Sequence, residues 1–253
     1  MVYVAIICLL HIGLNMSLAP VDYDFGTPAN YAFAENITCS NDEAKKMYVE
    51  AFGHMLNYNH EQAIACFTKC AELDPNCAMA WWGIAYCLSS SYNWSAGLGP
   101  GYDAISQAVS LKDHCSELEQ DLIMALSKRH TKEARDNANP AALNMGNSPE
   151  LNQAFAEAMA PLYEKYSGNL DVTAIYVEAL MNLNPWTLWN KDTTSGEITP
   201  VDDSTLMLIK IMEDAFENVP GAKEHPALCH LYCHALELSP YPERALPAAD
   251  VLR

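Results

Sequence analysis

Apolar side chains recur at helical spacing along nearly the whole chain, and the alternating pattern of strands is almost absent. Pro, Gly, Asn and Asp mark the breaks between the apolar runs. The pattern predicts helices over residues 41–57, 60–73, 76–89, 102–111, 116–130, 149–167, 169–183, 203–218, 226–238 and 241–252. Ser40 and Glu43 have the spacing of a capping box at the start of the first. We therefore expect an all-α protein with essentially no sheet.

The longest irregular segment covers residues 184–202, "NPWTLWNKDTTSGEITPVD". Trp186 and Trp189 stand in an otherwise polar stretch, so we expect a non-helical loop whose two tryptophans are mostly buried. With Tyr58 and the segment "SYNW" at 91–94, they can form the aromatic wall of a pocket. The alternative is that these aromatic residues only fasten loops to the scaffold.

Helix pairs joined by short turns suggest a repeat protein, and one repeat is recognisable. The tetratricopeptide (TPR) pattern has a period of about 34 residues, with Ala, Phe, Ala and Pro at fixed offsets before the Trp of the next unit. These offsets are occupied by Ala63, Phe67, Cys70 in place of Ala, Pro75 and Trp81. The clearest repeat unit is 44–89, and Phe67 and Trp81 are expected to be buried between its helices.

Four longer motifs resemble one family of TPR-repeat proteins, found in bacteria and some eukaryotes and mostly without an assigned activity. They are "YDFGT" at 23–27, "LNYNHEQAIACFTKCAELDPNCAMAWWGIAY" at 56–86, "NPWTLW" at 184–189 and "HPALCHLYCHALELSPYPERALPAADVLR" at 225–253. The resemblance implies a right-handed superhelix of helical hairpins, with one domain over 20–253. Because the family's chains continue into another His-rich helix pair, it also implies that this chain is a C-terminally truncated fragment.

The net charge and the absence of two catalytic sequence motifs restrict the classes of function that fit the chain. The chain of 253 residues has 32 acidic and 14 basic residues, a formal charge of −18. Such a surface repels nucleic-acid phosphates and anionic lipids. The sequence also has no glycine-rich phosphate loop after a strand and no nucleophile elbow, so it leaves open whether the protein is an enzyme.

Residues 1–19 have no charged side chain, and the apolar run 2–10 has the length of a signal-peptide core. Ser17 and Ala19 provide small residues before a cleavage site, although no Lys or Arg precedes the run. We expect a signal peptide, and secretion over a cytoplasmic location, with a buried N-terminal segment as the alternative. The stretch is too short and interrupted for a stable membrane span.

Secretion would make two other features meaningful. Asn36 and Asn93 begin glycosylation sequons, and we expect one of them to carry a glycan. The chain has nine cysteines, two pairs of which are four residues apart: Cys66 with Cys70, and Cys229 with Cys233. Cysteines at this helical spacing seldom form a disulfide and pack well as free thiols in a helical core.

The candidate site lies on the predicted helix 226–238. At 100° per residue, His230, His234 and Glu237 fall within about 60° of one another. The apolar residues on the opposite side are Leu228, Leu231, Ala235 and Leu238. Two imidazoles and a carboxylate on adjacent turns suit a transition metal such as Zn, Cu or Fe. The alternative is that they are polar helix residues with ordinary hydrogen bonds.

His60, at the start of another predicted helix, is either a further metal ligand or a helix N-terminal residue bonded to backbone donors. Two functions therefore remain open. The first is a scaffold that binds a protein, a peptide or a small molecule in the concave groove of a TPR array. The second is a metal-binding protein or metalloenzyme whose His/Glu site lies inside the superhelix.

Overall fold

The computed structural model describes residues 32–93, 99–136 and 148–252. The predicted signal peptide 1–19, the motif at 23–27 and Trp94 lie outside these residues. The chain divides into two compact units: residues 1–90 with 94–158, and residues 91–93 with 159–253. The expectation of one domain over 20–253 stays a prediction.

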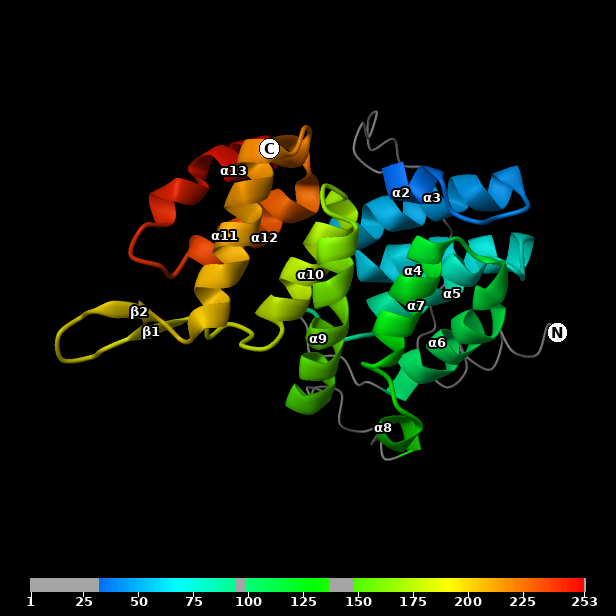
Figure 1. The fold of residues 1–253 in the computed structure, drawn as a ribbon, viewed down its shortest axis with the longest axis horizontal. Coiled ribbons are helices and arrows are strands. Elements are labelled where there is room, and N and C mark those ends of the chain that lie inside the picture. The colour runs from blue at the N-terminus through cyan, green and yellow to red at the C-terminus, as the bar shows by residue number, and fades with distance from the viewer. Residues whose placement is uncertain (1–31, 94–98, 137–147, 253) are drawn as a thin grey trace. The chain divides into compact units, whose positions relative to one another are not determined.

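Helices make up nearly all of the described first unit, as the apolar pattern predicts (Figure 1). Its elements are α2 (Ala32–Glu35), α3 (Asp42–Leu56), α4 (His60–Leu73), α5 (Ala78–Cys87), α6 (Gly99–Leu111), the 3-10 turn η1 (Lys112–His114), α7 (Glu117–Ser127), α8 (Lys132–Asp136) and the first part of α9 (Pro149–Lys165). Helix α3 packs on α4, α4 on α5 and α5 on α6. Helices that follow one another in the chain are thus neighbours in this unit.

The predicted burial of Phe67 and Trp81 is confirmed. Phe67 is fully buried and Trp81 is 8% exposed. The ring centroids of Phe67 and Tyr48 are 5.3 Å apart. The Phe67 ring also fills the space beside Gly83, where an added Cβ atom would lie 2.4 Å from Phe67 Cζ. Because Gly83 has no side chain, the Phe67 ring can pack closely between α4 and α5.

The predicted capping box at Ser40 is wrong. Helix α3 is capped instead by Asn41, whose side chain accepts from the backbone N–H groups of Glu43 and Ala44. Ser40 is engaged elsewhere, because its backbone N–H and its hydroxyl both donate to Asp74 Oδ2, at 2.7 and 2.8 Å. This carboxylate follows the last residue of α4 and ties the start of α3 to the end of α4.

A capping box is present two helix pairs later, at the start of α7. Ser116 accepts from the backbone N–H of Glu119, and the Glu119 carboxylate accepts from that of Ser116. The same buried carboxylate accepts from the backbone N–H and hydroxyl of Thr38, at 2.7 and 2.6 Å. One side chain thus joins the segment before α3 to α7.

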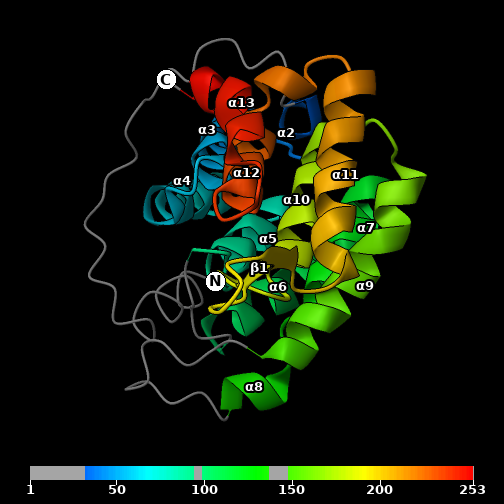
Figure 2. The ribbon, with the colours of Figure 1, turned by 90° about the vertical axis from the view of Figure 1, so that its left-hand side faces the viewer.

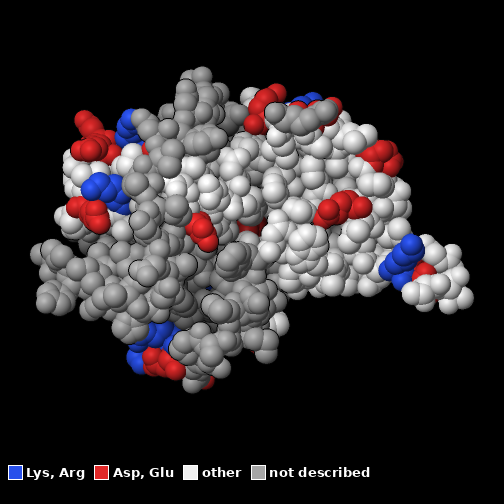
Figure 3. Space-filling view, turned by 180° about the vertical axis from the view of Figure 1, so that it is seen from behind, with Lys and Arg blue, Asp and Glu red and all other residues white. Residues whose placement is uncertain are grey.

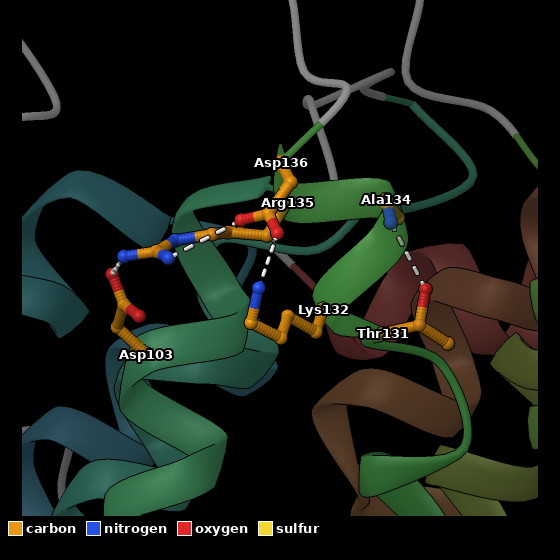
Figure 4. Close-up of polar contacts among 6 residues, drawn as sticks. All are labelled: Asp103, Thr131, Lys132, Ala134, Arg135 and Asp136. Atoms are coloured by element: carbon orange, nitrogen blue, oxygen red, sulfur yellow. Dashed lines mark hydrogen bonds and ion pairs between the residues drawn. The ribbon is translucent and has the colours of Figure 1, made fainter.

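Exposed ion pairs link helix α8 to α6 and join residues within α8 (Figure 4). Arg135 on α8 lies 3.1 Å from Asp103 on α6 and also pairs with Asp136, and Lys132 pairs with Asp136 one turn away. The Thr131 hydroxyl accepts from the backbone N–H of Ala134 at the helix start. Because exposed ion pairs contribute little to stability, packing must supply most of the stability of this region.

The second unit contains the rest of α9, α10 (Leu170–Met181), β1 (Trp189–Lys191), β2 (Ile198–Pro200), α11 (Asp203–Asn218), η2 (Ala222–Glu224), α12 (Pro226–Leu236), η3 (Pro242–Ala245) and α13 (Leu246–Val251). Within it, α10 packs on α11 and α12, and α12 packs on α13. Figure 2 shows α11, α12 and α13 from another side.

The segment 184–202 is non-helical, as predicted. Among the described residues it contains the only sheet, a short two-stranded hairpin, so the mostly helical structure is consistent with the predicted all-α fold. Strands β1 and β2 pair antiparallel, with Trp189 opposite Pro200 and Lys191 opposite Ile198. The turn is stabilised by Asp192, whose carboxylate accepts from two backbone N–H groups, and by Gly196 at a φ of 77°. The polar residues from which a loop was predicted therefore form the turn that connects β1 to β2.

The two tryptophans of this segment differ. Trp189 is buried, at 9% exposed, and its Nε1 donates to the carbonyl oxygen of Ala235 on α12 at 2.7 Å. It fastens the hairpin to α12. Trp186 is 52% exposed, so the expectation that both are mostly buried is wrong for this residue. Its ring instead lies on the surface against Tyr92.

The described helices include none that is both long enough and apolar enough to cross a bilayer. On the face shown in Figure 3, acidic side chains are spread widely over the described surface, and basic side chains lie beside acidic ones. The wide spread of acidic side chains agrees with the formal net charge of −18.

Candidate functional site

Helix α12 begins at a buried histidine that sequence reasoning missed. His225 is the N-cap residue, and its Nδ1 accepts from the backbone N–H of Leu228 at 3.3 Å. Its Nε2 therefore carries the proton and donates to Asp171 Oδ1 on α10, at 3.2 Å. Both side chains are buried, so this contact fixes the start of α12 against α10. The dipeptide His225-Pro226, with proline at the first helical turn, was the available signal.

The apolar face of α12 is largely as predicted. Leu228, Leu231 and Ala235 are buried. Leu238 is 53% exposed, and its predicted place in the core is wrong. The reason is that α12 ends at Leu236, with Glu237 as its C-cap, so that residue 238 no longer follows the helical face.

His230 and His234 lie together on α12, with ring centroids 4.8 Å apart. Burial, together with the neighbouring His234, lowers the pKa of His230 to about 4. The His230 imidazole is therefore neutral at pH 7, which is the form that can bind a metal.

His234 is held through both ring nitrogens. Its Nδ1 lies 2.7 Å from Glu237 Oε1, and its Nε2 lies 3.0 Å from the side-chain amide nitrogen of Asn93. Because an amide nitrogen only donates, Nε2 is the acceptor and Nδ1 donates to the carboxylate. A metal could reach Nε2 only by displacing Asn93.

Two aromatic side chains complete this arrangement. Tyr92 stacks on Trp186 with ring centroids 5.3 Å apart, and His234 contacts Tyr92 at 5.3 Å and Trp186 at 5.7 Å. Burial raises the pKa of Tyr92 to about 12, so its phenol stays protonated. We call Tyr92, Asn93, Trp186, His234 and Glu237 the aromatic–imidazole cluster. All five belong to the second unit. Tyr92 of "SYNW" contacts Trp186 of "NPWTLW", while a pocket lined by these aromatic residues stays a prediction.

Trp186 also has an unusual backbone, with a φ of 61°. A bulky side chain in the left-handed region is a conformational outlier that costs about 1–3 kcal/mol. Such strain is most common at functional sites, where the surrounding structure holds the residue in place. An exposed tryptophan held in this way is the most distinctive feature of the cluster.

The other predicted pocket residue, Tyr58, shows the same strain in the first unit, with a φ of 60°. Its ring lies 5.8 Å from that of His60, the first residue of α4. Burial lowers the pKa of His60 to about 4. His60 belongs to the first unit and the α12 histidines to the second, so a shared ligand set stays a prediction.

Among the described residues, two groups bring one donor atom from each of three side chains within 4.8 Å of one another. They are Cys39, Cys70 and Cys77, and Glu50, His54 and Cys66. Both lie in the first unit, and neither includes His230, His234 or Glu237, whose role as metal ligands stays a prediction. The sequence signal for the first group was Cys70, which stands where the TPR pattern predicts alanine; no metal site was inferred from it.

Comparisons of the chain with protein-family models, with curated proteins and with solved structures found no match.

Proposed function

We propose that the protein is a TPR-like helical scaffold that binds a protein or peptide partner, and that the aromatic–imidazole cluster is part of the binding surface. The observation that carries the proposal is the half-exposed Trp186, held at a strained φ and stacked on Tyr92. A tryptophan fixed before binding contributes contact area with little loss of conformational entropy. Tryptophan and tyrosine are also the residues most enriched at binding hot spots.

The chemistry of the cluster favours a basic group on the partner. The face of an aromatic ring attracts a Lys or Arg side chain, and Glu237 provides a carboxylate nearby. The charge of −18 would draw a basic peptide toward the protein and repel an acidic one. We therefore propose a lysine- or arginine-containing segment as the partner.

The test is a titration of the protein with a lysine- and arginine-rich peptide and with a matched glutamate-rich peptide. We expect binding of the basic peptide alone, weakened by salt and by Trp186→Ala. A cation–π contact of about 0.5–2 kcal/mol predicts a loss of roughly 2- to 30-fold. Leu206→Ala is the matched control, because Leu206 is 50% exposed in the same unit. Equal loss in both variants, or equal binding of both peptides, would contradict the proposal.

The second candidate function is binding of Zn, Cu or Fe by His230, His234 and Glu237. The 4.8 Å separation of the two α12 imidazoles and the neutral state of His230 support it. Since Asn93 occupies Nε2 of His234, Asn93→Ala should strengthen binding of Zn²⁺ and His230→Ala should weaken it. Equilibrium dialysis against Zn²⁺ with both variants tests this, and unchanged affinity in both would reject it.

A further inference from the structure

Three thiols of the first unit meet where three elements come together. Cys39 lies just before the N-cap of α3, Cys70 is in the last turn of α4, and Cys77 is the N-cap of α5. Their Sγ atoms all lie within 4.8 Å of one another, and those of Cys70 and Cys77 are 3.9 Å apart. Cys70 and Cys77 are buried, and all three are free thiols. We call these residues the thiol triad.

The spacing of the triad matches that of a metal–thiolate centre. With Zn–S bonds of about 2.3 Å, two sulfurs of a tetrahedral site are roughly 3.8 Å apart. A disulfide would need sulfurs about 2.05 Å apart. The Sγ atoms of Cys70 and Cys77 thus already have the separation of two ligands on one ion.

A carboxylate lies beside the triad. Asp74 Oδ2 is 3.4 Å from Cys39 Sγ, and it is fixed by the backbone N–H and hydroxyl of Ser40. Asp74 Oδ1 accepts from the backbone N–H of Asn76 at 3.1 Å. The carboxylate is therefore oriented by neighbouring donors, as outer groups commonly are at metal centres, and it can be the fourth ligand or an acceptor beside it.

Packing alone does not explain the residue types. The N-cap position is usually occupied by Ser, Thr, Asp or Asn, whose side chain bonds a free backbone N–H. Cys77 occupies the N-cap of α5, where its sulfur is a weaker acceptor for the free backbone N–H groups than an oxygen would be. Buried cysteines do pack as small apolar residues, but packing gives no reason for three thiols and an oriented carboxylate to converge.

We propose that Cys39, Cys70 and Cys77 bind a thiophilic d¹⁰ metal ion, Zn²⁺ in the first instance, with Asp74 completing or supporting the site. Three sulfur ligands favour this class of ion over Mg²⁺ or Ca²⁺. Binding forms three metal–sulfur bonds and releases the three thiol protons, without a change of oxidation state. The ion would join the beginning of α3, the end of α4 and the beginning of α5, and so stabilise the first TPR-like hairpin against unfolding.

The experiment uses the whole chain, kept reduced and freed of metal by dialysis against a chelator. Titration with Co²⁺ should give the sulfur-to-cobalt charge-transfer and visible bands of a tetrahedral thiolate site. We expect one ion per chain, displacement by Zn²⁺, and a Zn²⁺-dependent rise in Tm. Cys77→Ala, Cys70→Ala and Cys39→Ser should each weaken binding at least about 100-fold, on the scale of outer-shell losses of 10- to 100-fold.

Two matched variants keep the result specific. Cys87→Ala removes a buried thiol of α5 outside the triad, and Cys66→Ala removes one from the other group in the first unit. Both should retain the charge-transfer band. If the buried variants fail to fold, the partly exposed Cys39→Ser decides the question. Absence of the band in the reduced protein, or its persistence in Cys39→Ser and Cys77→Ala, would overturn the proposal. Trp186→Ala should leave the band unchanged, so this test is independent of the peptide-binding proposal.

Discussion

The side-chain amide of Asn93 donates to Nε2 of His234 at 3.0 Å, although 141 residues separate the two in sequence. This bond holds the short segment 91–93 beside α12, within the second unit. It also sets the tautomer of His234, because Nδ1 must then donate to Glu237. The orientation of the predicted metal ligand thus depends on a residue far away in the chain.

Loss of this bond should be measurable as a coupling energy. We expect Asn93→Ala to lower the free energy of unfolding by about 1 kcal/mol, the usual net value of one hydrogen bond. His234→Ala should cost more, because it also removes contacts with Tyr92 and Trp186. In urea unfolding, the double variant should cost less than the sum of the two single variants by about 0.5–1 kcal/mol. Asn190→Ala, on the exposed hairpin, is the control, and strict additivity would contradict the bond.

The buried contact between Asp171 and His225 should be the more costly one to break. We expect Asp171→Leu to destabilise the protein by about 1–3 kcal/mol, because the buried Nε2–H group of His225 loses the Asp171 acceptor. Asp171→Asn keeps an acceptor oxygen and should cost clearly less. Chemical denaturation of both variants, followed by circular dichroism, provides the comparison. Equal costs would mean that the site tolerates loss of the acceptor and that α12 is fixed mainly by packing.

Much of the helical architecture could be predicted because it depends on local periodicity. The apolar spacing located α4 and α11 to the residue, and the TPR offsets identified Phe67 and Trp81 as core residues. The errors come from contacts between distant residues. Ser40 does not cap α3 because Asp74, 34 residues later, accepts both of its donors.

In the candidate site, too, local features could be predicted from the sequence and contacts between distant residues could not. Helical arithmetic placed His230 and His234 on one face, and the aromatic composition linked Tyr92 to Trp186. The sequence pattern could not show that the Asn93 side chain is hydrogen-bonded to Nε2 of His234. Nor could it show that Trp186 stays exposed on a strained backbone. The thiol triad was missed for a related reason, since Cys39 lies 31 residues before Cys70 (70 − 39) in sequence and only folding brings their sulfurs together.

The contact between Phe67 and Gly83 predicts a large effect from one added methyl group. Alanine is a better helix former than glycine by about 0.5–1 kcal/mol, so Gly83→Ala would stabilise a helix with free space there. Here its Cβ would lie 2.4–2.6 Å from three atoms of the Phe67 ring, and we expect a net loss of about 1–3 kcal/mol. Phe67→Leu should relieve part of that loss in the double variant. A Gly83→Ala protein with an unchanged or higher Tm would contradict the close packing of α4 and α5.

The burial of His60 predicts a loss of stability in mild acid. Its pKa is about 4 in the folded protein, below the ordinary value near 6.5 expected in the unfolded chain. Between these two values the unfolded chain binds the proton and the folded protein does not, so the free energy of unfolding decreases as the pH falls from 6.5 toward 4. At pH 5 the effect of this one residue should be about 2 kcal/mol relative to pH 7.

Urea unfolding at pH 7 and pH 5 separates this contribution from that of other groups. His60→Gln cannot take up a proton, so the variant should lose about 2 kcal/mol less than the natural sequence over this interval. His114→Gln is the control, because His114 is an exposed histidine of the same unit. Burial also lowers the pKa of His230 to about 4, so the His60→Gln protein should keep part of its acid sensitivity. If His60→Gln and His114→Gln change the pH dependence equally, His60 is accessible to solvent and its imidazole is charged in the folded protein at pH 5.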